Sequence, residues 1–250
     1  MTVLLLRTAR RSGLKNKIKM DMKYRITSET KVVGNITLHR IECVTAFGDV
    51  ERGEKGGWIE SEKNLSQSGN ARVGGNAVVC GNAIVSEDAW VGWDAWVGGN
   101  AVVGGNAWVG GNAVVGGNAR VGGNAVVGGN ARVGGNARVG GNATISENAI
   151  VSENAWVSGN ARVCGNAIVR DNADYIVFKN WWSSGRYFTW TRSNNMWRVG
   201  CFYCSGEELI AKAYQDSEKS GREYERVVKY VNDILKEEDN DNHRGHGGGA

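Results

Sequence analysis

Hydrophobic and polar positions recur with a strict period of six residues between residues 69 and 174. The stretch 121–145 reads VGGNAVVGGNARVGGNARVGGNATI. In each hexad an Asn or Asp is followed by Ala, by a variable residue, and by Val or Ile; only the last hexad has Tyr175 instead. Because Ala and the aliphatic residue stand two positions apart, an extended chain directs both to one face and the variable residue to the other. The pattern predicts eighteen very short strands, each with one apolar face.

The Gly-Asn pairs between these strands predict turns, because both residue types tolerate positive φ. A strand this short cannot bury its apolar face alone and must stack on copies of itself. We therefore predict an all-β solenoid, a parallel β-helix with an Ala/Val core and Asn side chains stacked at the corners. Stacked amides of this kind can hydrogen-bond from one coil to the next. The absence of Pro agrees, because Pro would remove a ladder N–H.

The segments on either side of the repeat predict two caps, since an open β-helix exposes unpaired backbone groups at both ends. Residues 22–68 read as an N-terminal β-hairpin cap with its turn at Gly34-Asn35, and Trp58 and Leu65 lead into the first coil. Residues 175–236 read as a small α+β C-terminal module. It begins with a hairpin or three-stranded meander and continues with two helices, opened by capping boxes at 205–208 and 220–223.

The two ends of the chain are polar and lie outside these elements. The first twenty residues carry six basic side chains and no acidic one, although the formal net charge is only +4. We expect residues 1–21 to be a disordered upstream extension rather than a basic arm for nucleic acid or an anionic surface. Residues 237–250 read as a disordered, solvated tail.

The hexad Val-Gly-Gly-Asn-Ala-x resembles the hexapeptide repeat of left-handed parallel β-helix proteins. The resemblance implies left-handed winding with three hexads in each triangular coil, and hence about six coils. The flanks resemble the ends of uncharacterised phage and prophage hexapeptide-repeat proteins, in KYRITSETKVVGNITLHRIECVTAFGDVERGEKGGWIESEKNLSQSGNARV and DYIVFKNWWSSGRYFTWTRSNNMWRVGCFYCSGEELIAKAY. This resemblance covers residues 22 to about 236. It implies a phage-type protein without an assigned function.

With three hexads to a coil, the variable residues fall into three outward columns. The first column contains Arg72, Trp90, Trp108, Val126, Thr144 and Arg162. The second contains Val78, Trp96, Val114, Arg132, Ile150 and Ile168, and the third contains Ile84, Val102, Arg120, Arg138, Trp156 and Asp174. Val, Ile and Trp fill eleven of the eighteen positions, and apolar strips of this size are typical of interfaces.

The second column predicts the contact of a homodimer or homotrimer through Val78, Trp96, Val114, Ile150 and Ile168. Binding of another partner is predicted at Trp90, Trp108, Arg120, Arg138 and Trp156. Trp90 and Trp108 form a stacked pair suited to a protein, a sugar or a base, or are covered by a neighbouring subunit. The like-charged pair Arg120 and Arg138 calls for a phosphate or acidic partner unless the two side chains splay apart in solvent.

Known β-helix enzymes of this kind suggest an alternative, an acyl or sugar-nucleotide transferase that uses a His as general base. The chain has no His between residues 40 and 242, and His39 lies in the predicted hairpin. Cys201 and Cys204 have metal-ligand spacing without further ligands nearby, so we expect free thiols in a reducing cytoplasm and neither metal nor cofactor.

We therefore expect a non-enzymatic, cytoplasmic binding protein of phage type. The sharpest hypothesis is an antagonist of a host factor, such as a defence system, that occupies a protein or sequesters an anionic ligand. The repeat's charge gives no support for nucleic acid, and no segment is apolar enough for a membrane span. A transferase and a structural or virion spacer stay open as alternatives.

Overall fold

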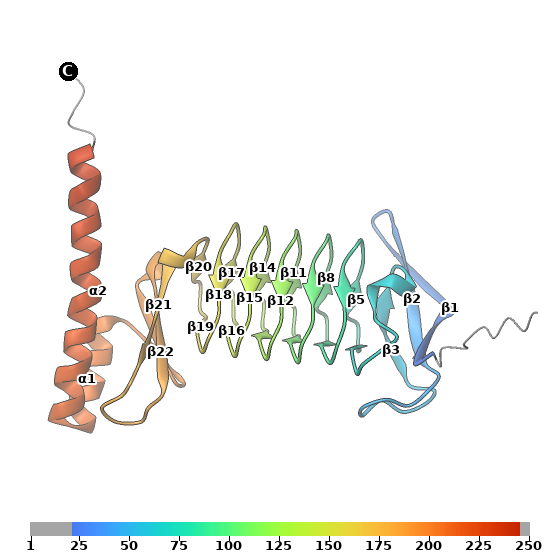
Figure 1. Cartoon of the computed structure of the whole chain (residues 1–250), viewed down its shortest axis with the longest axis horizontal. Helices are drawn as coiled ribbons and strands as arrows, with labels where there is room; N and C mark the ends of the chain where they lie inside the picture. Colours follow the sequence, from blue (N-terminus) through green and yellow to red (C-terminus); the bar gives the residue numbers. More distant parts are fainter. Residues whose placement is uncertain (1–21, 246–250) are drawn as a thin grey trace, which may run out of the picture.

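The computed structural model describes residues 22–245 and places a stack of coils between two caps (Figure 1). The coils run along the long axis of the molecule. Strands β1 to β3 lie at one end, and the sheet beginning with β21 lies at the other together with helices α1 and α2. The predicted parallel β-solenoid of about six coils is therefore confirmed. Left-handed winding stays a prediction from the resemblance.

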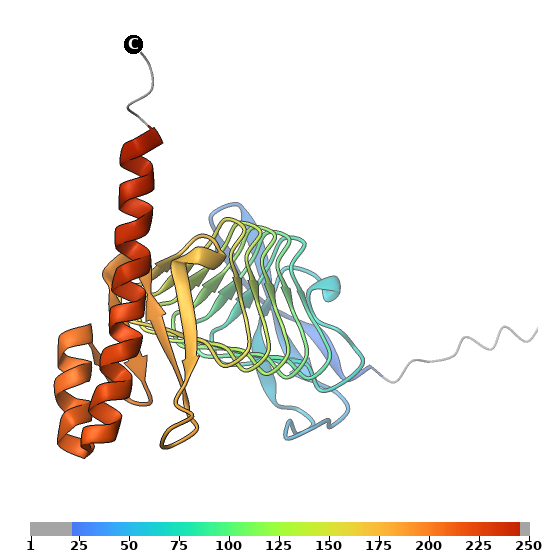
Figure 2. The ribbon, with the colours of Figure 1, turned by 60° about the vertical axis from the view of Figure 1, so that its left-hand side comes forward.

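The strands of successive coils form three sheets, one on each face of the solenoid, and Figure 2 shows the coils stacked one behind another. The six-strand face consists of β4 (Arg72–Val73), β7 (Trp90–Val91), β10 (Trp108–Val109), β13 (Val126–Val127), β16 (Thr144–Ile145) and β19 (Arg162–Val163). The nine-strand face contains β5 (Val78–Val79), β8 (Trp96–Val97), β11 (Val114–Val115), β14 (Arg132–Val133), β17 (Ile150–Val151) and β20 (Ile168–Val169), besides β1 to β3. The five-strand face consists of β6 (Ile84–Val85), β9 (Val102–Val103), β12 (Arg120–Val121), β15 (Arg138–Val139) and β18 (Trp156–Val157).

These faces reproduce the three predicted columns except at the last hexad. Residues Asn172–Asp174 form the short 3-10 helix η2, and Tyr175 opens β21, so Asp174 does not lie on the five-strand face. The physical reason is local: the Asp171 carboxylate accepts the Ala173 N–H and the Asp174 carboxylate accepts the Arg170 N–H, which closes a turn in place of a strand.

The core of the β-helix consists of the repeated Ala and Val or Ile side chains, which are almost fully buried. At the corners, the Asn82 amide donates to Asn100, Asn100 donates to Asn118, and Asn118 donates to Asn136, at distances of 2.9 to 3.1 Å. The predicted Asn ladder is confirmed. Glycine is required beside it: Gly117 has φ +61, and a Cβ there would lie 2.8 Å from the Gly135 carbonyl oxygen of the next coil.

The N-terminal cap is the antiparallel hairpin of β1 (Tyr24–Val33) and β2 (Ile36–Cys43), as predicted, followed by β3 (Lys55–Ile59) and the 3-10 helix η1 (Glu62–Asn64). Strand β3 pairs with β2 on one side and with β5 of the coil on the other. Side chains satisfy the remaining edge: Lys23 Nζ donates to the Ala71 carbonyl at 2.7 Å, and Asn64 Nδ2 donates to the Ala83 carbonyl at 2.9 Å. The cap thus removes the open edge of the first coil.

The C-terminal cap contains a four-stranded antiparallel sheet, one strand more than the largest meander that the sequence predicted. Its strands are β21 (Tyr175–Lys179), β22 (Tyr187–Thr191), β23 (Met196–Val199) and β24 (Phe202–Cys204), with the 3-10 helix η3 (Arg192–Asn194) between β22 and β23. Thr189 and Ser193 cover the last coil, because their hydroxyls accept the N–H groups of Arg162 at 2.9 Å and Ile168 at 2.7 Å.

Helices α1 (Gly206–Asp216) and α2 (Glu218–Gly245) pack against this sheet and correct two predictions. The first capping box is confirmed at Ser205 and Glu208. The second was placed too late: α2 begins at Glu218, and the Ser217 hydroxyl accepts the Ser220 N–H. The predicted tail is wrong up to residue 245, since α2 continues there; residues 246–250 and the predicted extension 1–21 lie outside the described residues. Within the described chain, neither helix has the length and apolarity to cross a bilayer.

Candidate binding sites

Three of the five predicted binding residues lie together on the five-strand face. Arg120, Arg138 and Trp156 occupy successive rungs of this sheet, because β12 pairs with β15 and β15 with β18 in parallel register. With Val102 and Glu87 they line a shallow groove of about 380 Å³, whose side wall is the backbone of corner glycines. We call it the arginine groove. Because the corner glycines have no side chains, the large outward side chains project above the surface beside them and form the groove.

The two arginines of the groove are exposed and face each other in register at the strand spacing of about 4.8 Å. Neither guanidinium forms an ion pair with any of the acidic side chains that the structure describes, those of residues 22–238. The indole of Trp156 is 55% exposed on the next rung. The groove therefore presents two positive charges without an ion-pair partner beside an accessible aromatic ring, and the Glu87 carboxylate that also lines it accepts the Gly105 N–H.

The other two predicted binding residues, Trp90 and Trp108, lie on the six-strand face and pair in register. Their ring centroids are 6.2 Å apart. A third indole that we did not predict, Trp93, lies against both, at 4.9 Å from Trp90 and in an edge-to-face contact at 5.1 Å from Trp108. The predicted pair is thus part of a three-tryptophan cluster on the corner that follows the six-strand face.

Trp93 occupies the turn position at which neighbouring coils have Gly75 and Gly111. Its φ is +56, a left-handed conformation that is uncommon for a residue with a bulky side chain. The signal was present in the sequence, as the one Trp that replaces a turn glycine of the repeat. The hexad pattern predicts a turn at this position and does not place the Trp93 side chain.

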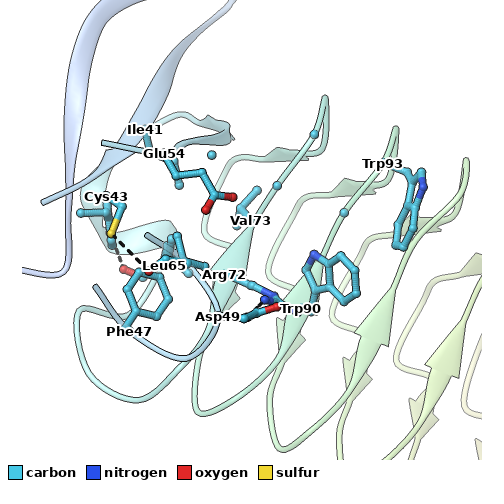
Figure 3. Close-up of a pocket in the computed structure, with 16 residues that line it drawn as sticks. Ile41, Cys43, Phe47, Asp49, Glu54, Leu65, Arg72, Val73, Trp90 and Trp93 are labelled. Atoms are coloured by element: carbon cyan, nitrogen blue, oxygen red, sulfur yellow. Dashed lines mark hydrogen bonds and ion pairs between the residues drawn. The ribbon is translucent and has the colours of Figure 1, made fainter. Parts of the chain in front are cut away.

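A second pocket, of about 330 Å³, lies at the end of the β-helix nearest the N-terminal cap (Figure 3). Its floor consists of the buried side chains of Ile41, Cys43, Leu65 and Val73. The rim carries Phe47, Asp49, Glu54, Arg72, Trp90 and Trp93. We call it the aromatic pocket. It lies between the loop after β2 and the first two coils of the six-strand face, so both the cap and the repeat contribute to it.

An ion pair closes one side of the aromatic pocket. Arg72 contacts the Asp49 carboxylate, and its guanidinium lies over the Trp90 ring at 4.2 Å from the centroid (Figure 3). Desolvation by burial holds the pKa of Arg72 below its ordinary value. Arg72 thus joins the loop to the coil by a charge contact on one side and a cation–π contact on the other.

Lys23 makes a similar connection between the loop after β2 and the first coil. Its ammonium group lies over the Phe47 ring at 4.7 Å from the centroid while donating to the Ala71 carbonyl. Desolvation by burial lowers the pKa of Lys23 to about 8, and the nearby Asp88 carboxylate opposes this shift. The Phe47 loop is therefore held by a buried cation.

The two caps of the chain cover part of the strip of residues that was predicted as the oligomer contact. Val78 is buried against Leu38 and Trp58 of the N-terminal cap, so its prediction as an outward contact is wrong. The reason is that β3 extends the nine-strand face and lays Trp58 beside Val78. At the other end η3 packs beside Ile168. Trp96 is partly buried against the same cap cluster, and Val114 and Ile150 remain outward between the two caps.

The cysteines lack the surroundings of a reactive or metal-binding site. Cys43, Cys80, Cys164 and Cys204 are buried, and all five cysteines are free. Desolvation by burial raises the pKa of the Cys164 thiol to about 11 and that of Cys204 to about 12. Within residues 22–245 no three potential metal ligands lie together.

Comparison with known families gives one result for the repeat. The family model described as YdcK Beta solenoid repeat matches residues 137–153. This stretch includes β15, β16 and β17, one rung of each face and thus about one coil. No curated protein matches the chain. The match and the fold agree that this is a repeat β-solenoid protein.

Proposed function

We propose that this protein is a non-enzymatic binding protein that sequesters a phosphate-bearing ligand in the arginine groove. The observation that carries the proposal is the in-register pair Arg120 and Arg138, exposed and without an acidic partner in the described chain. Like charges on adjacent strands oppose one another unless an anion lies between them. A guanidinium binds phosphate oxygens in bidentate fashion, and two stacked guanidinium groups offer a matching surface.

The position of Trp156 favours a ligand that also carries a ring. Trp156 lies directly beside Arg138 in the sheet, about 4.8 Å along the axis, and its indole is exposed. Bases stack on aromatic side chains with little dependence on their identity. A nucleotide with its phosphates on the two arginines and its base on Trp156 matches this order of side chains.

Phage or prophage origin, cytoplasmic location and antagonism of a host factor belong to the same proposal, and they rest on the resemblance of both flanks to phage hexapeptide-repeat proteins. A protein that sequesters a host nucleotide would act without chemistry. The sequence agrees, because the repeat contains no His to serve as general base, and His39 lies in β2, outside the coils.

Titration calorimetry of the full-length protein tests the proposal with four probes: a mononucleotide, a dinucleotide, an uncharged nucleoside and inorganic phosphate. We expect the nucleotides to bind more tightly than either the nucleoside or phosphate. The double variant R120A/R138A should weaken nucleotide binding at least about tenfold, equal to about 1.4 kcal/mol, and should reduce its salt dependence. W156A should weaken nucleotides and leave inorganic phosphate unchanged.

Arg132 supplies the matched control, because it is an equally exposed arginine at the same hexad position on the nine-strand face. R132A should bind within about twofold of wild type. Affinity capture from host extract, analysed for metabolites and proteins, would then identify the physiological ligand. If R120A/R138A still binds every probe and captures every molecule that the wild type does, the arginine groove is not the binding site.

A further inference from the structure

Three aromatic rings near the N-terminal cap make cation–π contacts. The ammonium group of Lys23 lies over Phe47, the guanidinium of Arg72 lies over Trp90, and Trp58 has Lys31 at 4.5 Å and Arg40 at 5.1 Å from its centroid. Among the described residues no cation lies over the fourth ring, Trp93, although its side chain is 49% exposed at the pocket rim. The ring of Trp93 is therefore accessible to a cation from outside the described chain.

The charges that line the aromatic pocket leave a negative excess. Arg72 is matched by Asp49, whereas the Glu54 carboxylate forms no ion pair with the side chains described in residues 22–238 and accepts the Glu51 N–H at 3.1 Å. Figure 3 shows Glu54 and Trp93 on either side of Val73, with the carboxylate directed toward Val73. Lys23 is held over Phe47, and Arg40 and Lys31 are held over Trp58; none of these three cations lines the pocket.

We infer that the aromatic pocket binds a substituted ammonium ion, with the cationic head between Trp93 and Glu54 and its apolar substituents on Val73 and the buried floor. Alkylated ammonium groups combine a positive charge with an apolar surface, and aromatic rings with a nearby carboxylate recognise them through cation–π attraction. This site is separate from the arginine groove in residues and in sign of charge, so its test does not depend on the proposed nucleotide.

The backbone at Trp93 supports a binding role over a structural one. The turn is built for Gly, as at Gly75 and Gly111 one coil before and after, and Trp is held there at φ +56. A residue kept in an unfavourable conformation points to a role that the favourable residue cannot perform. Replacement by Gly therefore removes the indole and restores the ordinary turn of the repeat.

Choline and 3,3-dimethylbutan-1-ol form the matched probe pair, because they have nearly the same shape and differ in charge. In titrations of the full-length protein we expect choline to bind at least about tenfold more tightly than the uncharged alcohol. W93G and E54Q should each weaken choline at least about tenfold. E54Q should leave binding of the alcohol unchanged, since only the charge is lost. A short peptide with one trimethyllysine tests whether the ammonium group comes from a protein instead of a free metabolite.

Two variants control for the substitutions themselves. E51Q removes a neighbouring carboxylate that does not line the pocket, and E153G restores Gly at another positive-φ turn, far from the cap. Both should retain choline affinity within about twofold. Circular dichroism must show an intact β-helix, and W93N, which tolerates positive φ, replaces W93G if the latter does not fold.

Equal binding of choline and the alcohol would overturn the inference, as would undiminished choline affinity in W93G or E54Q. Absence of choline binding up to about 10 mM, where even weak cation–π sites are occupied, would also overturn it. Tighter binding of the trimethyllysine peptide than of choline would support the site and assign the cation to a partner protein.

Discussion

At the scale of single residues, the alternation of a strand determines where the side chain at the variable hexad position lies, and the turn position has no such rule. Each outward side chain follows from the two-residue alternation of a strand, so Arg120, Arg138 and Trp156 could be placed on one face once three hexads were assigned to a coil. Trp93 could not be placed in this way, because its role depends on a corner conformation that brings it against Trp90 and Trp108. The alternation of a strand does not report where a turn residue points.

Trp93 also gives a prediction about stability. Left-handed backbone at a residue with a Cβ costs about 1–2 kcal/mol, and aromatic contacts like those with Trp90 and Trp108 return about 0.5–1.5 kcal/mol each. Because these effects nearly cancel, we expect W93G to change the free energy of unfolding by no more than about 1 kcal/mol. Chemical denaturation of both proteins measures this. A loss of several kcal/mol would assign Trp93 to the packing of the fold.

At the scale of elements, the repeat was predicted almost completely and the caps only in outline. Nearly identical hexads occupy equivalent positions in successive coils, so one pattern was enough to predict the Ala/Val core and the Asn ladder. The caps have no such redundancy. The start of α2 was placed at Ser220 because Ser220 and Glu223 fit a capping box, but Ser217 already accepts the Ser220 N–H and begins the helix one turn earlier.

The caps should matter because they satisfy the open edges of the coils. Thr189 is buried, and its hydroxyl accepts the Arg162 N–H at the end of the six-strand face. T189V keeps the shape of the side chain and leaves that N–H without an acceptor, which should cost about 1–3 kcal/mol. T144V, on the outward side of the same face, should cost less than about 0.5 kcal/mol. A shift of similar size in the urea midpoints of both variants would mean that the hydroxyl of Thr189 is not needed at the edge.

At the scale of the whole molecule, the sequence could not show how the caps cover the faces. The nine-strand column is apolar at five of its six positions, which suggested one continuous contact strip. In the fold, the cap lays Leu38 and Trp58 against Val78 and packs against Trp96, so only Val114 and Ile150 stay clear of the caps among the apolar positions. Long-range placement of this kind depends on contacts between segments that no periodic pattern relates.

The shorter strip still predicts self-association through the nine-strand face, because Trp96, Val114 and Ile150 lie on one flat sheet and Val114 is 38% exposed. W96R/I150E replaces the two apolar side chains that flank Val114 and Arg132 on this face, and it should convert a dimer or trimer to monomers in light scattering, since charges buried at an apolar contact are strongly unfavourable. The matched control is W156R/I84E, which makes the same kind of change on the five-strand face, where Trp156 and Ile84 are also exposed. It should leave the mass unchanged. If the control dissociates the assembly and W96R/I150E does not, the subunits meet through the five-strand face, and the arginine groove is then an interface between copies instead of a ligand site.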